Sequence, residues 1–232
     1  MTLPNLERSQ RRSCEADFAP ESIAATVLRE TDHRIGNLLT ILAGELRHEL
    51  SEFRHPGIRR AVARHERRIV DFAELHHLLA AGVLDADVLG QDYLSRLLEV
   101  LSRSILSPLN VRCQVHLAHG APSAEQCKWL GRIITELVIN SAKHAFRGIY
   151  GGVVRVSLFS SGGSWLCTVF DNGVGISGSP LGTGSRIVTS LLRFLDGRIT
   201  TCSGPGGTLI SIRFPAMAED WATGDANDNA CG

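Results

Sequence analysis

Residues 135–146 have the sequence TELVINSAKHAF, and residues 169–176 have the sequence VFDNGVGI. The first stretch carries four polar side chains at the spacing i, i+4, i+7 and i+8, which places them on one face of a helix: Glu136, Asn140, Lys143 and His144. Such a stripe can hold a hydrated Mg²⁺ ion and a phosphate chain, because Mg²⁺ prefers oxygen ligands and lysine binds phosphate. By itself the stripe is equally well a solvated helix face.

The second stretch ends an apolar strand with the sequence DNGVG, residues 171–175. Its glycines let the backbone come close to a ligand, and the Asp171 carboxylate can accept a hydrogen bond from an exocyclic amine. Gly182 and Gly184 then open a helical pattern and offer free backbone N–H groups to an anion. Gly206-Gly207-Thr208 precedes the last predicted strand. A lone DxGxG would be an ordinary turn, so the prediction of a ligand site depends on the three glycine motifs following one another along the chain.

The N-terminal part of the chain predicts a helical hairpin. Residues 22–50 contain no proline and carry apolar side chains at helical spacing. His55-Pro56-Gly57 breaks the pattern, and a second apolar helix follows up to Gly82. Two helices cannot cover both apolar stripes, so we expect this hairpin, residues 22–82, to pair with a second copy in a four-helix bundle.

The character of the sequence changes after residue 82. Helices are expected near residues 93–101, 123–146 and 185–195, and strands at 111–117, 153–159, 165–170, 198–203 and 208–214. This pattern predicts an α+β sandwich over residues 83–215, with helices on one face of a mixed sheet. Residues 1–21 and 216–232 are polar and predicted to be disordered.

Composition excludes several function classes. The 232 residues hold 24 basic and 24 acidic side chains, so no basic field favours a nucleic acid or a membrane as partner. No apolar run reaches the ~20 residues of a spanning helix, and the N-terminus lacks the apolar stretch of a secretory signal, so we expect a cytoplasmic protein. Six scattered cysteines form no CxxC pair, and nine histidines form no HxxxH or HExxH pair.

The motifs resemble a known family when they are taken together. TELVINSAKHAF, VFDNGVGI, LGTGSRIV and GPGGTL follow the order of the N box and glycine boxes of the GHKL ATPases. Upstream, TDHRIGNLLTILAGEL (residues 31–46) resembles the phosphoacceptor box of sensor histidine kinases of the HRxxN type, which is related to the HWE group. The chain departs from that pattern at Gly36 and Leu38, where the family usually has Lys and Asn, and in a lid of only six residues, 176–181.

The resemblance implies a role for each box. His33 would be the phosphorylated imidazole, Asn140 a Mg²⁺ ligand supported by Glu136, and Lys143, with His144 beside it, a phosphate contact. Asp171 would bind the adenine amino group of ATP. The remaining residues would shape the pocket and lid or lie beneath the base: Gly173, Gly175, Gly182, Gly184 and Thr208. The implied fold is a helical hairpin that forms a dimeric four-helix bundle, followed by a GHKL α/β sandwich.

The resemblance predicts a histidine kinase that takes a phosphoryl group from MgATP onto His33 and passes it to an aspartate of a response regulator receiver domain. A separate sensor protein is a further possible partner, since only about twenty residues precede the hairpin, fewer than the ~50 of a small domain. Two alternatives stay open: a phosphorelay module with a degenerate ATP-binding domain, and a GHKL-fold anti-sigma-factor kinase or binding protein.

The group that polarises His33 is the least determined part of the site. Glu30 and Asn37 lie at i−3 and i+4 from His33 and share its helix face, whereas Asp32 points about a quarter-turn away. A carboxylate that accepts from one ring nitrogen makes the other nitrogen the better nucleophile, so Glu30 is our candidate. The alternative is that Glu30 is only a solvated residue near a helix N-terminus.

Overall fold

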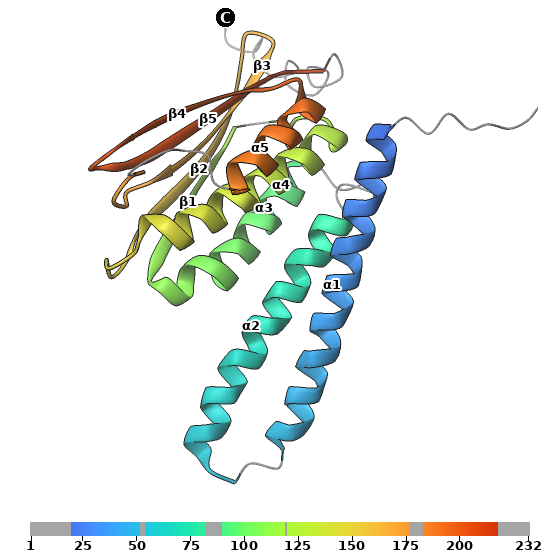
Figure 1. Cartoon of the computed structure of the whole chain (residues 1–232), viewed down its shortest axis with the longest axis vertical. Coiled ribbons are helices and arrows are strands. Elements are labelled where there is room, and N and C mark those ends of the chain that lie inside the picture. The colour runs from blue at the N-terminus through green and yellow to red at the C-terminus, as the bar shows by residue number, and fades with distance from the viewer. Residues whose placement is uncertain (1–19, 52–53, 82–89, 119, 177–182, 218–232) are drawn as a thin grey trace, which may run out of the picture.

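The computed structural model describes residues 20–51, 54–81, 90–118, 120–176 and 183–217. A long helical hairpin leads into an α/β sandwich, and Figure 1 shows the hairpin reaching far beyond the sandwich. Residues 1–19 and 218–232 of the expected tails, and the lid from residue 177 on, lie outside the described residues. Residues 20 and 21, which were expected in the N-terminal tail, are helical.

The hairpin consists of α1 (Pro20–Leu50) and α2 (Pro56–Ala81). Proline is tolerated in the first turn of a helix, so Pro56 begins α2 and does not interrupt it. Gly36 and Ala43 are buried, and both small residues bring the two helices close together. A Cβ atom on Gly36 would lie 2.9 Å from the His77 ring of α2.

The α/β sandwich, residues 90–217, is called the α/β unit below. Its sheet has the order β1-β2-β3-β5-β4, with β1 parallel to β2 and every other pair antiparallel. Helices cover one face of the sheet (Figure 1). The elements are α3 (Gly90–Leu101), η1 (Ser102–Leu106), η2 (Ser107–Leu109), β1 (Val111–Leu117), α4 (Ala124–Asn140), η3 (Ser141–Ala145), β2 (Gly152–Ser161), β3 (Ser164–Asp171), α5 (Thr183–Leu192), η4 (Arg193–Leu195), β4 (Arg198–Gly204) and β5 (Gly207–Pro215).

Helix α4 runs through the centre of this unit. Ser123 caps it, because the Ser123 side chain accepts from the Gln126 N–H while the Gln126 side chain accepts from the Ser123 N–H. Its apolar face is buried, and Trp129 stacks on Phe194 with ring centroids 4.0 Å apart. The apolar residues 130, 133, 134, 137 and 138 lie in this core, so the polar stripe of the helix is turned elsewhere.

The structure confirms the predicted fold class, a helical region followed by a mixed-sheet sandwich. Trp165 is buried, as expected for a core residue. The hairpin differs from the well-packed sandwich, because six large apolar side chains of α1 stay exposed: Ile23, Val27, Leu28, Leu38, Ile41 and Leu42. Pairing with a second copy remains a prediction.

Candidate functional site

Asp171 ends β3 and lies in the interior of the α/β unit, only 5% exposed. Its carboxylate accepts three hydrogen bonds from three parts of the fold. The Ser141 hydroxyl donates at 3.0 Å, the Gly173 N–H at 3.2 Å and the Thr208 N–H at 3.3 Å. Because carboxylate oxygens have lone pairs for more than three donors, Asp171 is a fixed acceptor that can still bind a ligand N–H group.

The glycines beside Asp171 are needed for close backbone contact. A Cβ atom on Gly173 would lie 2.3 Å from the Ala145 carbonyl oxygen, and one on Gly207 would lie 1.9 Å from the Asp171 carbonyl oxygen. Gly207 also has a φ of +120°, which side-chain-bearing residues rarely adopt. These contacts join the end of β3 to η3 and β5, so the structure brings Asp171, Gly173 and Thr208 together.

The polar stripe of α4 continues into a π-helical turn. Glu136 and Asn140 are half-buried on α4, while Lys143 and His144 are exposed on η3. These oxygen and nitrogen donors suit a hydrated Mg²⁺ ion and phosphate groups. In the part of the chain that the structure describes, no three His, Cys, Asp or Glu side chains converge, so a metal ion here would depend on the ligand for further oxygens.

The remaining predicted glycines, Gly175, Gly182 and Gly184, fall only partly within the described residues. Gly184 lies in the first turn of α5, the part of a helix whose backbone N–H groups have no partner within the helix and can bind an anion. Gly175 has a φ of +74° and packs against Gly204. Gly182 lies outside the described residues.

A groove of about 740 Å³ separates the hairpin from the α/β unit. Its walls come from both parts: Leu28 of α1 and Leu79 of α2 face Arg132 and Glu136 of α4, with α5 on the remaining side. Glu136 is the one predicted site residue among the described residues that line this groove. The polar stripe of α4 therefore approaches the helices that carry His33.

His33 itself is exposed on α1. Its Nδ1 atom lies 3.3 Å from the Asn37 side-chain nitrogen, and its ring meets the His77 ring edge-on with centroids 6.1 Å apart. With the Asn37 amide turned over, the Asn37 oxygen would accept from Nδ1–H and leave a lone pair on Nε2. Sequence reasoning named Asn37 only as a neighbour, and its contact with the ring is the new information.

Glu30 is bound elsewhere in this structure. Its carboxylate accepts a 2.7 Å hydrogen bond from Nε of Arg34, and this bond with the guanidinium charge lowers the pKa of Glu30 below its ordinary value. A lower pKa makes Glu30 a weaker proton acceptor. Its role beside His33 stays a prediction.

Sequence reasoning missed a buried cluster next to His33. The Asp32 carboxylate lies 2.5 Å from Nη1 of Arg132 in α4 and 2.9 Å from Nδ1 of His76 in α2. Arg132 also donates to the Leu79 carbonyl at 3.0 Å. The sequence separation of about one hundred residues between Asp32 and Arg132 left no local pattern that could have revealed this contact.

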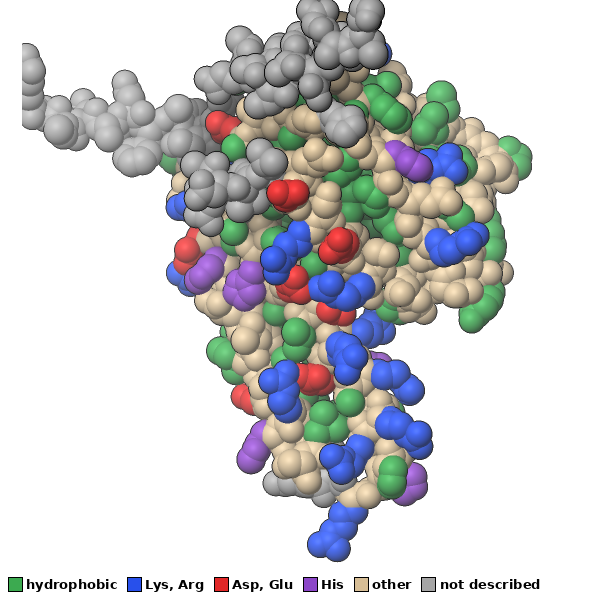
Figure 2. Space-filling model, turned by 180° about the vertical axis from the view of Figure 1, so that it is seen from behind, with side chains coloured by type: hydrophobic (Ala, Val, Ile, Leu, Met, Phe, Trp, Pro, Cys, Tyr) green, Lys and Arg blue, Asp and Glu red, His purple; other side chains and the backbone are tan. Residues whose placement is uncertain are grey.

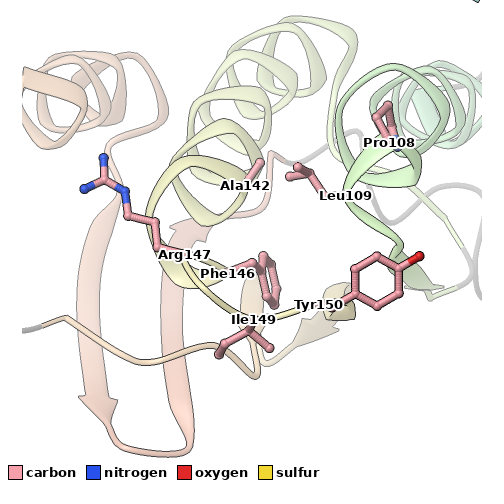
Figure 3. Close-up of a pocket in the computed structure, with 7 residues that line it drawn as sticks. All are labelled: Pro108, Leu109, Ala142, Phe146, Arg147, Ile149 and Tyr150. Atoms are coloured by element: carbon pink, nitrogen blue, oxygen red, sulfur yellow. The ribbon is translucent and has the colours of Figure 1, made fainter.

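A separate pocket of about 370 Å³ lies at the end of α4 (Figure 3). Apolar side chains from η2, from η3 and from the segment after η3 form most of its lining, with Arg147 at one side. No predicted site residue is among its described lining residues, whose polar groups are the Arg147 guanidinium and the Tyr150 hydroxyl.

Comparison with known proteins adds two family matches. The family model described as "Histidine kinase" matches residues 30–105, and the model described as "Histidine kinase-, DNA gyrase B-, and HSP90-like ATPase" matches residues 126–218. The first match includes His33, and the second includes every predicted residue of the nucleotide pocket. Among the described residues, no helix is long and apolar enough to cross a membrane.

A curated relative is the sensor histidine kinase PdtaS of Mycolicibacterium smegmatis, 29% identical over 199 residues. The match covers 81% of this chain but only 39% of that protein. The solved histidine kinase domain of the Erythrobacter litoralis EL346 blue-light activated histidine kinase has a TM-score of 0.55 at 20% identity, covering 76% of this chain and 96% of that one. A longer structure of the same kinase gives 0.55 at 22% identity, covering 77% and 60%. At these identities the structural likeness shows the fold alone.

Proposed function

Because the chain belongs to the HWE-type histidine kinases and carries a GHKL ATP-binding domain, we propose that it transfers the γ-phosphoryl group of MgATP to His33 and then to an aspartate of a response regulator. The observation that carries the proposal is the groove in which Glu136, on the polar stripe of α4, faces both helices of the hairpin. A nucleotide domain that acts by binding alone has no need of that arrangement.

Asp171 would hold the adenine end of the nucleotide. Its three hydrogen-bond donors fix the carboxylate, so it can accept from the adenine amino group without rearranging. Thr208, whose hydroxyl lies 2.9 Å from that of Ser203, would lie beneath the base. Gly173, Gly175, Gly182 and Gly184 would shape the pocket and its lid.

The phosphate end would lie along the polar stripe of α4. Asn140, supported by Glu136, would hold the Mg²⁺ ion, which neutralises charge on the phosphate oxygens. The exposed Lys143 and His144 would contact the phosphate chain. These residues bind and orient, which is the main contribution of protein groups in phosphoryl transfer.

At the acceptor, a nitrogen of the His33 ring would form the N–P bond while the bond from the γ-phosphorus to the β–γ bridging oxygen breaks. The ring proton must leave the imidazole in the process. Asn37 would fix the ring orientation through its contact with Nδ1. Glu30 is the proposed acceptor of the proton, provided that it exchanges Arg34 for His33.

The exposed apolar stripe of α1 supports a homodimer through the hairpin. Five of the six exposed apolar side chains recur along one side of a helix whose opposite side packs on α2: Ile23, Val27, Leu38, Ile41 and Leu42. Burying such a side chain is worth ~1.5 to 3 kcal/mol, so a second copy would gain substantially by covering it. A dimeric four-helix bundle is the arrangement that does so.

The charge of the hairpin supports an acidic partner. Five exposed arginines occupy the half of α2 that is remote from the ATP-binding domain, and none pairs with an acidic side chain among the described residues: Arg59, Arg60, Arg64, Arg67 and Arg68. Figure 2 shows the basic side chains gathered over this part of the molecule. A receiver domain that presents an aspartate would meet complementary charge here.

Incubation with γ-labelled ATP and Mg²⁺ tests the proposal. We expect label on the protein that is lost in acid, as phosphohistidine is, and that disappears in His33→Gln while ATP affinity is unchanged. Label that persists in His33→Gln would place the acceptor elsewhere. An unlabelled parent protein that binds no ATP would favour the relay module, and one that phosphorylates a serine of another protein would favour the anti-sigma-factor kinase.

A further inference from the structure

The residue directly before the phosphoacceptor is buried in a contact between domains. Asp32 is 8% exposed, although the neighbouring His33 faces solvent. Its two carboxylate oxygens bind different elements, one the Arg132 guanidinium on α4 and the other the His76 ring on α2. One carboxylate thus joins α1 to α2 and to the helix that carries Glu136 and Asn140.

Arg132 completes this cluster. Its side chain is 9% exposed, and Nη2 donates to the Leu79 carbonyl near the end of α2. Its Nε atom has no hydrogen-bond partner among the described residues. A buried ion pair that is incompletely satisfied contributes little net stability, because desolvation offsets much of the attraction. The role that we infer for this ion pair is to fix one arrangement of the helices.

The arrangement that it fixes turns His33 away from Glu136. Ala24 and Leu28 of α1 line the groove with Glu136, but His33 does not. At about 100° per residue, His33 lies about 140° around the helix from Leu28 and about 180° from Ala24. The acceptor imidazole is therefore on the far side of α1 from its own nucleotide domain, beside His77 of α2.

We propose that Asp32, Arg132 and His76 form an interdomain anchor that holds the kinase at rest, and that opening this anchor limits the rate at which His33 is phosphorylated. The inference rests on the proposed function, with Asp32 and Arg132 as positioning residues. While the anchor is closed, His33 is exposed to a partner protein but is out of reach of the phosphate end of its own ATP site. Opening the anchor frees α1 to turn or slide until the imidazole faces the groove.

The test uses the double variant Asp32→Asn/Arg132→Gln in the full chain. Removing both charges avoids leaving one of them buried and unpaired, which would destabilise the fold. Glu74→Gln is the matched control, because Glu74 also joins the hairpin to the ATP-binding domain, through Arg96 and Arg103, but holds α2 and not α1. Arg132→Lys is a milder second variant that keeps the charge and loses the fork.

Two measurements decide the outcome. In single-turnover labelling at saturating MgATP, we expect the double variant to be about 5- to 150-fold faster than the parent, the range of typical coupling free energies, with KM for ATP unchanged. Arg132→Lys should give a smaller increase, and Glu74→Gln should match the parent. A rate equal to or below that of the parent, with ATP binding intact, would overturn the anchor, since a merely structural role predicts no gain.

Hydrogen exchange separates this inference from the proposed function. Without nucleotide, the amides of residues 24–36 should exchange faster in the double variant than in the parent and in Glu74→Gln. This result is expected even if His33 is never phosphorylated. In that case the interdomain anchor is supported and only the proposed kinase function fails. Unchanged exchange in this segment would overturn the anchor.

Discussion

Asp171 and His33 are the two ends of the proposed reaction, and the fold treats them in opposite ways. Asp171 is almost fully buried and accepts hydrogen bonds from a helix-end hydroxyl, a turn and a neighbouring strand. His33 is exposed, and the hydrogen-bond contact that it makes among the described residues comes from Asn37 of its own helix. In the proposed reaction, the nucleotide end would be fixed within a single chain, whereas the acceptor end would stay accessible to the proteins or domains that must reach it.

The largest effect should come from placing charges in the exposed apolar stripe of α1, through which we propose that the hairpin pairs with a second copy. We expect Leu38→Arg/Ile41→Arg to weaken dimerisation by ~10³-fold or more, because each copy places two charges in the apolar contact. Sedimentation at several concentrations measures this change, and ATP affinity should stay the same. The exposed Val115 on strand β1 offers a control, since Val115→Arg should leave the dimer intact. A parent chain that sediments as a monomer at micromolar concentration would contradict the prediction.

The second prediction concerns Glu30, the proposed proton acceptor beside His33. If Glu30 takes the ring proton, Glu30→Gln should slow autophosphorylation by ~10²-fold with ATP binding unchanged. Arg34→Gln is the matched variant: it removes the guanidinium that lowers the pKa of Glu30, so the pKa rises toward its ordinary value and the rate should not fall. A Glu30→Gln rate within a few-fold of the parent would return Glu30 to the solvated surface.

A substitution at the buried Asp171 should have a smaller effect, limited to ATP binding. Asp171→Asn converts a charged acceptor into an amide and should weaken ATP binding at least about tenfold, since a hydrogen bond to a charged group contributes ~1.5 to 3 kcal/mol. Calorimetry measures the affinity, and circular dichroism checks that the fold survives. Asn140→Ala should instead remove Mg²⁺-dependent turnover and change metal-free nucleotide binding less. Unaltered affinity in Asp171→Asn would remove Asp171 from the adenine site.

The same contrast explains which features could be predicted from the sequence. The helices and strands follow from local periodicity, and the boxes around Asn140 and Asp171 are short segments whose order identifies them. The hairpin also follows, because Pro56 and Gly57 separate two apolar patterns. All of these signals lie within a few turns of the residues that they describe.

Long-range contacts gave no such signal. The pairing of β3 with β5 joins residues at least 37 positions apart in the sequence, as in Asp171 with Thr208. The Asp32–Arg132 ion pair depends on the rotation of two helices about their axes, which burial of the whole domain decides. Similarly, the π-helical turns η1 and η3 shift the helix register in a way that ideal periodicity does not anticipate.

The exposed arginines of α2 make the molecule electrically asymmetric although its net charge is zero. An uneven field of this kind accelerates diffusional encounter with an oppositely charged protein, and dissolved salt screens it over about 8 Å at physiological ionic strength. The association rate constant with a receiver domain would then fall as salt is added. Phosphorylation of His33 takes place within an assembled molecule, so its rate would change far less. Ionic strength would therefore slow phosphotransfer to the receiver domain but not autophosphorylation.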